Sequence, residues 1–341
     1  MDKPHLLGLT QEECQHLISE LGLPTFTAKQ ILDWVYQKKV SDFESMSNLS
    51  KANREKLQAT IDSSFYKSLQ LFPSKDGLAI KYVFELTEGQ KVESVVLKEK
   101  TYTTLCVSSQ AGCPVDCKFC LTGVVGFKRN LHTHEIVGQI FQAMQDGHQI
   151  SHLVFMGMGE PLLNYDNVMK AIDILQAPYG FNISKRKITV STSGYIAGIK
   201  RLIETDRKLN LAFSVGNANP AKRPAIMPIE NRNPITEVAK LLNTYQTKHN
   251  RKLTLEYTLL EGKNDEPEDI RDLIALAKYL RAKINLINLN PHPKIPFKPV
   301  PTKVLHKIKS WIEDARVPVT VRYKKGQDIS AACGQLGESY L

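Results

Sequence analysis

The segment Gly112-Cys-Pro-Val-Asp-Cys-Lys-Phe-Cys120 places three cysteines, Cys113, Cys117 and Cys120, in a CxxxCxxC spacing. Thiolates this close in sequence can bind one metal centre, and three of them leave a fourth coordination position open. Structural zinc sites usually fill all four positions with Cys or His. A 4Fe–4S cluster held by only three protein thiolates keeps one iron free to bind a substrate. A partial zinc site has the same spacing, so the rest of the chain must decide between the two.

The composition is that of a globular protein, with 341 residues, 42% hydrophobic and 23% charged. No apolar stretch reaches the roughly 18 residues that a membrane span needs, and the first residues lack the apolar run of a signal peptide. We therefore expect a cytoplasmic protein without membrane association. The formal net charge of +10 is compatible with a nucleic-acid partner, although many basic proteins simply carry solvated lysines.

The positions of the other cysteines also bear on the chemistry of this segment. Four of the six cysteines lie between Cys106 and Cys120, which indicates metal or redox chemistry in a reducing compartment rather than a disulfide framework. Cys333 has small neighbours on both sides, and these leave its sulfur accessible. The alternative for Cys106 and Cys333 is a small buried hydrophobe, the commonest fate of a free cysteine. We assign Cys14 to that class.

Residues 1–60 are expected to form a small helical accessory domain with a basic face. Thr10 and Glu13 have the spacing of a capping box at the start of the first helix. A second helix is predicted over residues 28–36. Its aromatic side chains could stack on bases, but aromatics at helical spacing more often belong to a core.

Residues 61–100 are expected to form a β-hairpin that links the helices to the rest of the chain. The strand-like segments 81–86 and 92–97 flank a polar turn. Glu93 lies within the second of these strands among apolar residues. A carboxylate on an edge strand that points to water is the ordinary interpretation of such a residue.

Residues 101–341 alternate between strand-like and helical patterns, which predicts an α/β fold with a parallel sheet covered by helices. About six such units would form a partial (βα)6 barrel similar to a TIM barrel, with functional residues where the strands end. The strands are predicted at residues 105–107, 153–156, 188–191, 209–214, 253–259, 284–289 and 317–321, and helices at 134–144, 168–175, 235–249, 267–281 and 303–315.

Polar residues follow several of these strands. Gly159 and Glu160 come after the second strand, where glycine lets the backbone approach a ligand and the carboxylate suits an ammonium group. Ser191 ends the third strand, and Asn290 follows the sixth. Each could be ordinary turn chemistry, but together with the cysteine segment they favour a binding face.

These motifs resemble the RlmN/Cfr family of radical S-adenosylmethionine RNA methyltransferases, and the resemblance extends over essentially the whole chain. It is carried by Leu105-Cys-Val-Ser-Ser-Gln-Ala-Gly-Cys-Pro-Val-Asp-Cys-Lys-Phe-Cys, Met156-Gly-Met-Gly-Glu-Pro-Leu-Leu-Asn, Ser184-Lys-Arg, Ser191-Thr-Ser-Gly and Ala331-Ala-Cys-Gly-Gln-Leu. It implies a radical S-adenosylmethionine barrel and an enzyme that methylates adenosine in RNA.

The resemblance also implies a role for each site residue. Cys113, Cys117 and Cys120 would hold one 4Fe–4S cluster, whose open iron chelates S-adenosylmethionine. Two molecules of S-adenosylmethionine are consumed per methylation: one methylates Cys333, and the second supplies the radical that activates this methyl group. Glu93 would be the base that removes the ring proton, and Cys106 would form a disulfide with Cys333 to release the product. Such exchange requires accessible thiols of low pKa.

The residues that match the family's S-adenosylmethionine contacts are Gly159, Glu160, Ser191, Ser214 and Asn290. Two positions depart from the family pattern. Gly216 stands where the family commonly has histidine after the fourth strand, and Asn288 replaces the first proline of a Pro-x-Asn-Pro motif. These departures concern the cofactor contacts and the choice of RNA.

The resemblance implies methylation at carbon 2 of adenosine 2503 in 23S rRNA and of adenosine 37 in tRNA, by a monomer that receives electrons from a flavodoxin or ferredoxin. The Cfr branch methylates carbon 8 of the same rRNA adenosine, and another RNA target is a further alternative. Outside this family, a zinc-containing RNA-binding module and a thiol redox switch of Cys106 and Cys333 remain alternatives.

Overall fold

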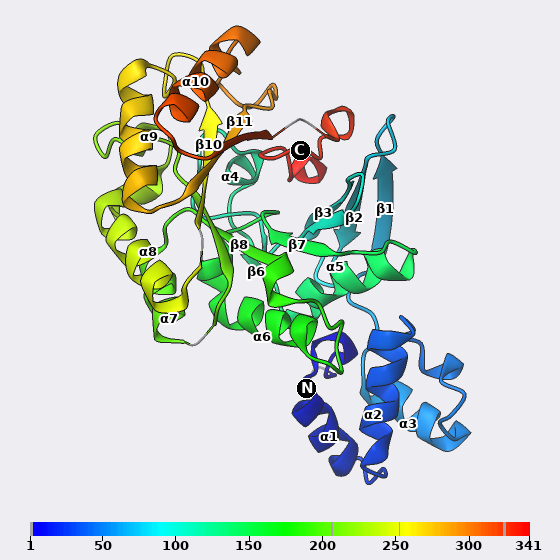
Figure 1. Ribbon diagram of the computed structural model, residues 1–341. Coiled ribbons are helices and arrows are strands. Elements are labelled where there is room, and N and C mark those ends of the chain that lie inside the picture. The colour runs from blue at the N-terminus through cyan, green and yellow to red at the C-terminus, as the bar shows by residue number, and fades with distance from the viewer. Residues whose placement is uncertain (1–2, 206, 252, 323–324) are drawn as a thin grey trace.

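The computed structural model describes residues 3–205, 207–251, 253–322 and 325–341. Its centre is a ten-stranded sheet in the order β1-β2-β3-β4-β7-β8-β9-β10-β11-β12. From β4 to β12 all neighbours are parallel, whereas β1 to β4 pair antiparallel. The parallel part curves into a barrel whose outer face is covered by helices (Figure 1). Because β1 and β12 are the two edges of the sheet, the barrel is partial, as predicted.

The strands of this sheet are β1 (Ser68–Pro73), β2 (Ala79–Glu85), β3 (Lys91–Lys98), β4 (Thr103–Cys106), β7 (His152–Phe155), β8 (Ile188–Thr192), β9 (Asn210–Ser214), β10 (Leu253–Leu259), β11 (Lys283–Asn288) and β12 (Val319–Arg322). A separate two-stranded sheet pairs β5 (Gln110–Ala111) with β6 (Arg129–Asn130). The helices are α1 (Gln11–Glu20), α2 (Phe26–Leu32), α3 (Lys51–Thr60), α4 (Leu121–Val125), α5 (Thr133–Gln145), α6 (Tyr165–Gln176), α7 (Ile196–Glu204), α8 (Ile235–His249), α9 (Pro267–Tyr279) and α10 (Thr302–Asp314).

The two faces of the barrel strands differ in chemistry. In β10, Leu253, Leu255 and Tyr257 are fully buried, whereas the alternate residues Thr254 and Glu256 line a cavity inside the barrel. Successive side chains of a strand point to opposite faces, so the apolar set packs under the helices and the polar set faces inward. TIM barrels fill their interior with layers of bulky aliphatic side chains. Here small and polar side chains leave room in the barrel.

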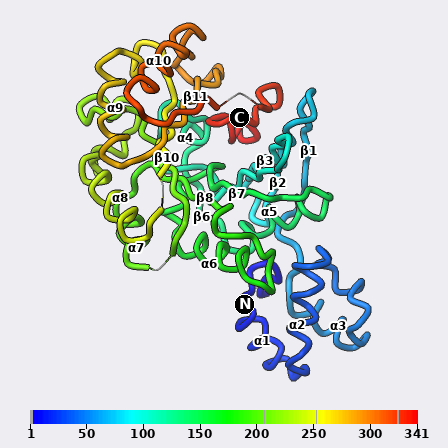
Figure 2. Tube along the Cα trace, viewed as in Figure 1, coloured from blue at the N-terminus to red at the C-terminus, as the bar shows by residue number. Residues whose placement is uncertain are grey.

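The N-terminal helices α1 to α3 form a small body beside the barrel, which Figures 1 and 2 show at the blue end of the chain. The predicted capping box of Thr10 and Glu13 is present at the start of α1. The predicted second helix differs, because α2 ends at Leu32 and the chain continues as a π-helical turn over Asp33–Gln37. Tyr36, in that turn, is fully buried and donates a hydrogen bond to the Leu7 carbonyl at 2.9 Å.

The predicted hairpin is part of a larger antiparallel unit. A strand that the sequence pattern did not reveal, β1, pairs with β2, and β3 pairs with both β2 and β4. Glu93 in β3 is therefore not on an edge strand, and its side chain is fully buried. The interpretation of Glu93 as an edge carboxylate pointing to water was wrong, because β3 is an internal strand and the C-terminal residue Ser339 packs on the carboxylate.

In the described part of the chain, no helix is both long enough and apolar enough to cross a membrane.

Candidate active site

Two cavities meet inside the barrel. The smaller has a volume of about 160 Å³ and lies at the carboxyl ends of the strands, where Cys113, Cys117 and Cys120 form part of its wall. The larger has a volume of about 720 Å³. Cys120 and Cys333 line both cavities, so one space leads into the other past these two thiols.

The cysteine segment follows the first barrel strand, as predicted, and all three of its thiols are half-buried side chains on the wall of the smaller cavity. Burial raises the pKa of the Cys113 thiol to about 12 and also raises those of Cys117 and Cys120. Neighbouring thiols add to the increase for Cys113 and Cys117. Thiolates here therefore need a cationic centre between them, which suits a metal cluster.

The spread of these thiols bears on the kind of centre. Among the described residues, no group of three or more His, Cys, Asp or Glu side chains converges closely enough to hold one metal ion. Three thiols around one cavity fit the corners of a cluster better than the ligand shell of a single ion. No other side chain of these types completes a zinc-like set of four among them.

Glu160 lies in the loop after β7, where Gly159 has φ +100° and a side chain at its Cβ would come within 2.5 Å of Gln110. The carboxylate is 3% exposed and accepts hydrogen bonds from the Ser193 amide at 2.7 Å and the Ser193 hydroxyl at 2.6 Å. Burial raises the pKa of Glu160, and these hydrogen bonds oppose the increase. Ser193 therefore orients the carboxylate on the cavity wall, ready for a cationic group.

Ser191 in β8 and Ser214 at the end of β9 also line the smaller cavity. The side chain that fixes these strand ends is Arg223, which is fully buried and forms an ion pair with Glu230 at 2.7 Å. Arg223 donates further hydrogen bonds to the carbonyls of Ser193 at 2.7 Å and Val215 at 2.8 Å. The sequence analysis missed this arginine, and no local motif marks it, because its partners are distant strand ends.

The two departures from the family pattern have structural explanations. Gly216 has φ +68°, and a Cβ there would lie 2.4 Å from the Met227 sulfur, so Met227 occupies the space that a side chain at 216 would need. The side chain of Asn288 exchanges two hydrogen bonds of 2.9 Å with the backbone of Val300. Asn288 thereby fastens the segment that follows β11, with a side chain where the family has a rigid proline.

Cys333 is held beside the cysteine segment by its own backbone neighbours. The Gly334 carbonyl accepts a hydrogen bond from the Leu121 amide at 2.7 Å, and the Leu336 carbonyl accepts one from the Thr122 hydroxyl at 2.7 Å. Asn290 donates to the Cys333 carbonyl at 3.0 Å. The C-terminal segment therefore packs on α4 directly after Cys120 (Figure 1). Cys333 lines both cavities.

Asn290 was predicted to contact S-adenosylmethionine. It lines the larger cavity rather than the smaller one, and its Oδ1 is a buried atom without a hydrogen-bond partner. This oxygen is free to accept a hydrogen bond from a ligand, while the amide nitrogen positions Cys333. Asn290 thus connects the cofactor side of the site with the thiol side.

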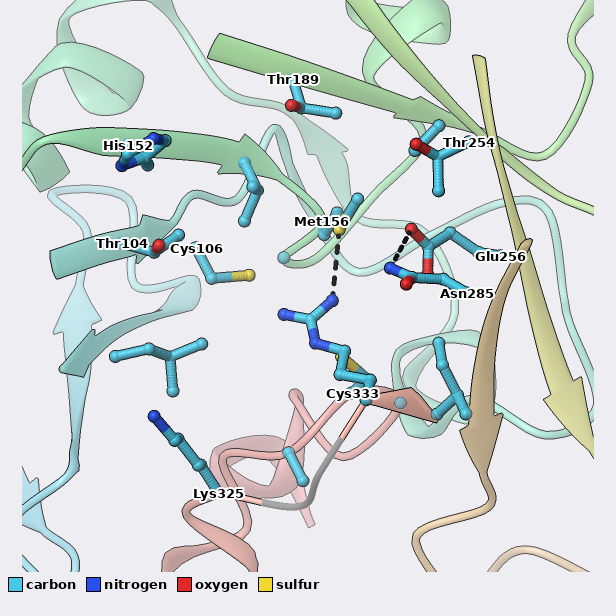
Figure 3. Close-up of a pocket in the computed structure, with 18 of the residues that line it drawn as sticks. Thr104, Cys106, His152, Met156, Thr189, Thr254, Glu256, Asn285, Lys325 and Cys333 are labelled. Carbon is cyan, nitrogen blue, oxygen red and sulfur yellow. Dashed lines mark hydrogen bonds between the residues drawn. The ribbon is translucent and has the colours of Figure 1, made fainter. Parts of the chain in front are cut away.

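Cys106 lies on the wall of the larger cavity, and Figure 3 shows it and Cys333 on the same open space. Its side chain is 8% exposed, and burial raises its pKa to about 12. The expectation of an accessible thiol with a low pKa was therefore wrong for Cys106, because it sits within a sheet rather than on a loop. Both Cys106 and Cys333 are free thiols here, with no disulfide between them.

Arg322 in β12 interacts electrostatically with both Cys106 and Cys333. It pairs in register with Ile287, lines both cavities, and donates to the Met156 sulfur at 3.6 Å, the dashed contact to Met156 in Figure 3. Its positive charge lowers the pKa of Cys106, against the larger effect of burial. The alternation of β12 could have indicated that Arg322 faces the barrel interior, but the sequence analysis did not use it.

Glu93 is not brought to either cavity. One carboxylate oxygen accepts a hydrogen bond from the Ser339 amide at 2.9 Å, and the other is buried without a partner. The last residues of the chain therefore cover Glu93, although it lies on the face of β3 that also carries Val95, the register partner of Cys106. Its predicted role as a base stays a prediction.

The comparisons with known proteins agree with this geometry. Residues 4–62 match the model of the ribosomal RNA large subunit methyltransferase N-terminal domain, and residues 107–274 match that of the radical SAM superfamily. The chain is 41% identical over 334 residues to a probable dual-specificity RNA methyltransferase RlmN of Aquifex aeolicus, covering 96% of this chain and 95% of that protein. A protein with the same description from Pseudothermotoga lettingae is 42% identical, with 97% of each chain covered.

A solved structure extends the similarity to three dimensions. The crystal structure of a radical SAM methyltransferase from Sphaerobacter thermophilus matches with a TM-score of 0.94 and 35% identity, over 97% of this chain and 98% of that one. The matches to the N-terminal domain, to the radical SAM superfamily and to the solved structure therefore point to the same family over almost the whole chain. The chain belongs to the RlmN family of radical SAM RNA methyltransferases, whose cofactors are a 4Fe–4S cluster and S-adenosylmethionine.

Proposed function

We propose that this protein methylates carbon 2 of an adenosine in RNA, namely adenosine 2503 of 23S rRNA and adenosine 37 of tRNA. The observation that carries the proposal is the placement of Cys106 and Cys333 on one cavity that adjoins the three-cysteine cavity. A zinc-containing RNA-binding module would need neither thiol. A simple thiol switch would need neither the cysteine segment nor Glu160.

In this proposal the smaller cavity holds the cofactors. Cys113, Cys117 and Cys120 hold the cluster, while Glu160, Ser191 and Ser214 with the backbone at Gly159 bind S-adenosylmethionine, and Asn290 reaches it from the adjoining wall. When bound, the cluster supplies the electron that cleaves the sulfonium of S-adenosylmethionine. Glu160, fixed by Ser193, suits the ammonium group of that cofactor.

The larger cavity holds the adenine and the two thiols that handle the methyl group. Cys333 carries the methyl group and faces both cavities, so it can receive a methyl group on one side and present it to a base on the other. The Cys106 thiolate would then attack the Cys333 sulfur. The S–S bond forms as the bond from Cys333 to the methyl-derived carbon breaks, and that carbon keeps the electron pair and takes up a proton to become the methyl group of the freed base. Arg322 supports this step, because its charge favours the thiolate of the buried Cys106.

Glu93 is the proposed base for the ring proton. Its unpartnered oxygen is available for a proton, but Ser339 and its neighbours separate it from the cavity. We infer that the C-terminal residues 338–341 move when RNA binds. The same movement would give Cys333 the freedom that two successive methyl transfers require.

The partners follow from the family. RNA is the substrate, and the N-terminal helices of residues 1–60 are proposed to bind it, while residues 61–100 link them to the core of residues 101–341. We propose a monomer in the cytoplasm that takes its electrons from a flavodoxin or ferredoxin. Methylation of carbon 8 is the second candidate, and the RlmN descriptions of its relatives and the Gly-Glu-Pro-Leu-Leu-Asn segment favour carbon 2.

The test is mass spectrometry of adenosines in rRNA and tRNA from a strain that lacks the gene, complemented with either the wild-type protein or Cys333→Ala. We expect 2-methyladenosine only with the wild type, and about four irons per chain after anaerobic reconstitution of both proteins. Appearance of 8-methyladenosine would establish the second candidate. Equal modification by both proteins, or a protein that binds only zinc, would contradict the proposal.

A further inference from the structure

The larger cavity opens at the amino ends of the barrel strands, at the opposite end from the cysteine segment. Its lining residues near the carboxyl ends, such as Thr122 and Asn290, are buried. Its exposed lining residues are Glu99 and Tyr102, between β3 and β4, Arg186 and Lys187, directly before β8, and Lys283 at the start of β11. The entrance is therefore at the amino ends.

A passage through the barrel connects this entrance with the two thiols. Its wall carries the short side chains of Thr104, Thr189 and Thr254, which Figure 3 shows around the open space that also contains Cys106. The volume of about 720 Å³ lies within the range of roughly 300–1,000 Å³ that is typical of small-molecule sites. The cavity therefore has the volume of a nucleoside site, and its lining extends from the amino ends to Cys106 and Cys333.

The opposite end of the barrel holds the smaller cavity, whose volume is about 160 Å³. The segment that bears Cys333 is tied to α4 by the bonds from Leu121 and Thr122 and to the end of β11 by Asn290. Ala332 and Leu336 on this segment are buried. A base that came from the carboxyl ends would have to displace the residue that is to methylate it.

The entrance is positively charged and carries an exposed aromatic ring. Arg186, Lys187 and Lys283 are exposed, and within residues 3–205, 207–251, 253–322 and 325–341 none of the three makes an ion pair. Lys325, which also lines this cavity, is neutralised by an ion pair with Glu99. Tyr102 is 44% exposed and lies against His152, with 4.8 Å between the ring centroids.

We propose that the RNA strand docks across the amino ends of the barrel strands and inserts its target adenosine through the barrel to Cys106 and Cys333. Arg186, Lys187 and Lys283 bind its phosphates, and Tyr102 stacks on a base next to the flipped one. Proteins that bind single strands combine such cations with aromatic stacking, and enzymes that modify a base take it out of the stack. The inference rests on the proposed function, because it takes RNA as the substrate.

The first experiment measures binding of a fluorescently labelled RNA hairpin with an unpaired adenosine to the reconstituted enzyme, by anisotropy over a series of salt concentrations. For single strands the slope of log K against log salt is about −0.7 per phosphate contact. Arg186→Gln with Lys283→Gln should therefore reduce its magnitude by about 1.4. The matched control is Lys240→Gln with Lys303→Gln, two exposed cations on α8 and α10 that line neither cavity. Thermal unfolding checks that both double variants are folded.

The second experiment separates stacking from charge. Tyr102→Ala should weaken RNA binding about tenfold or more, because one stacked base is lost, whereas Tyr102→Phe keeps the ring and should bind like the wild type. Tyr102→Ala should therefore raise KM for RNA, and Tyr102→Phe should keep KM close to the wild-type value.

The outcomes distinguish this inference from the proposed function. Equal effects of the entrance pair and the control pair, or a Tyr102→Ala variant that binds like the wild type, would overturn the docking surface even if methylation occurs. RNA binding that depends on the entrance residues without any methylation would instead overturn the proposed function and leave the docking surface in place.

Discussion

The two cavities of this barrel were specified in different ways by the sequence. The smaller one is lined by short local motifs, the cysteine segment and the Gly159–Glu160 loop, which lie together at the carboxyl ends of the strands. The larger one is lined in large part by single side chains of the barrel strands, drawn from residues between Leu97 and Leu336. Hydrogen bonds of Glu160 and Arg223 hold the wall of the first, and the second is the much larger of the two, as expected for a cofactor site beside a substrate site.

The largest effect should come from removing a thiol of the smaller cavity. Cys117→Ala leaves two thiolates for the cluster, so we expect loss of bound iron and of all methylation. Iron analysis and the visible absorbance of the reconstituted protein measure this directly. Cys106→Ala is the matched change in the larger cavity, and it should keep the iron while losing turnover. Loss of iron from both variants would contradict the assignment of the cluster to the smaller cavity alone.

The next effect concerns the arginine that holds the smaller cavity together. Arg223→Met leaves Glu230, 6% exposed, without its partner, and breaking a buried ion pair in this way costs about 3–5 kcal/mol of unfolding free energy. Arg201→Met breaks an exposed pair with Asp166 and should cost about 1 kcal/mol or less. Urea denaturation compares the two. Equal losses would show that Arg223 adds nothing beyond a surface contact.

A smaller effect is expected at Gly216. Gly216→Ala places a side chain at φ +68° and against the Met227 sulfur, so backbone strain of about 1–2 kcal/mol is joined by an overpacking cost of about 1–3 kcal/mol. Gly262→Ala is the control, since Gly262 has φ +65° with no atom within 4 Å of its Cβ. The difference in unfolding free energy between the two variants isolates the contact with Met227. No difference would mean that Met227 moves aside freely.

Features of this site that depend on neighbouring residues in the sequence could be predicted, and features that depend on contacts between distant parts of the chain could not. The cysteine segment, Glu160 and the strand ends were found because each is a local pattern whose position at the end of a strand follows from the alternation of strands and helices. Arg223 was missed because its hydrogen bonds reach Ser193 and Val215 on different strands. The burial of Glu93 depends on β4 and on Ser339, which no pattern around residue 93 contains.

The same reasoning applies to the barrel interior. The family resemblance named Cys106 and Cys333, but the passage that joins them to the amino ends follows from short side chains on three separate strands, β4, β8 and β10. β1 was missed because most of its residues are exposed, so it lacks the apolar alternation that marks a strand. The substrate cavity therefore depends on how distant strands pair, whereas the cofactor cavity can be predicted from local sequence motifs.

The last prediction tests the electrostatics that separate the larger cavity from the smaller one. The groups that interact with the Cys106 thiol are Arg322, which lowers its pKa, and Cys333, which raises it, while burial raises it most. Arg322 also interacts with Glu256 and Glu99. Arg322→Gln removes the positive charge and leaves the neutral thiol favoured, so the pKa of Cys106 should rise further, and the thiolate fraction at any pH below that pKa should fall.

The measurement is the rate of Cys106 alkylation by iodoacetamide from pH 7 to 10 in the reconstituted enzyme, followed by mass spectrometry of the peptide. Each unit of increase in the pKa slows the reaction about tenfold at a given pH below it. Arg322→Lys keeps the charge and should retain most of the wild-type rate. A rate reduced to the same extent in both variants at every pH would indicate that Arg322 acts only by packing. A shift confined to Arg322→Gln would show that its charge prepares the buried thiol for exchange with Cys333.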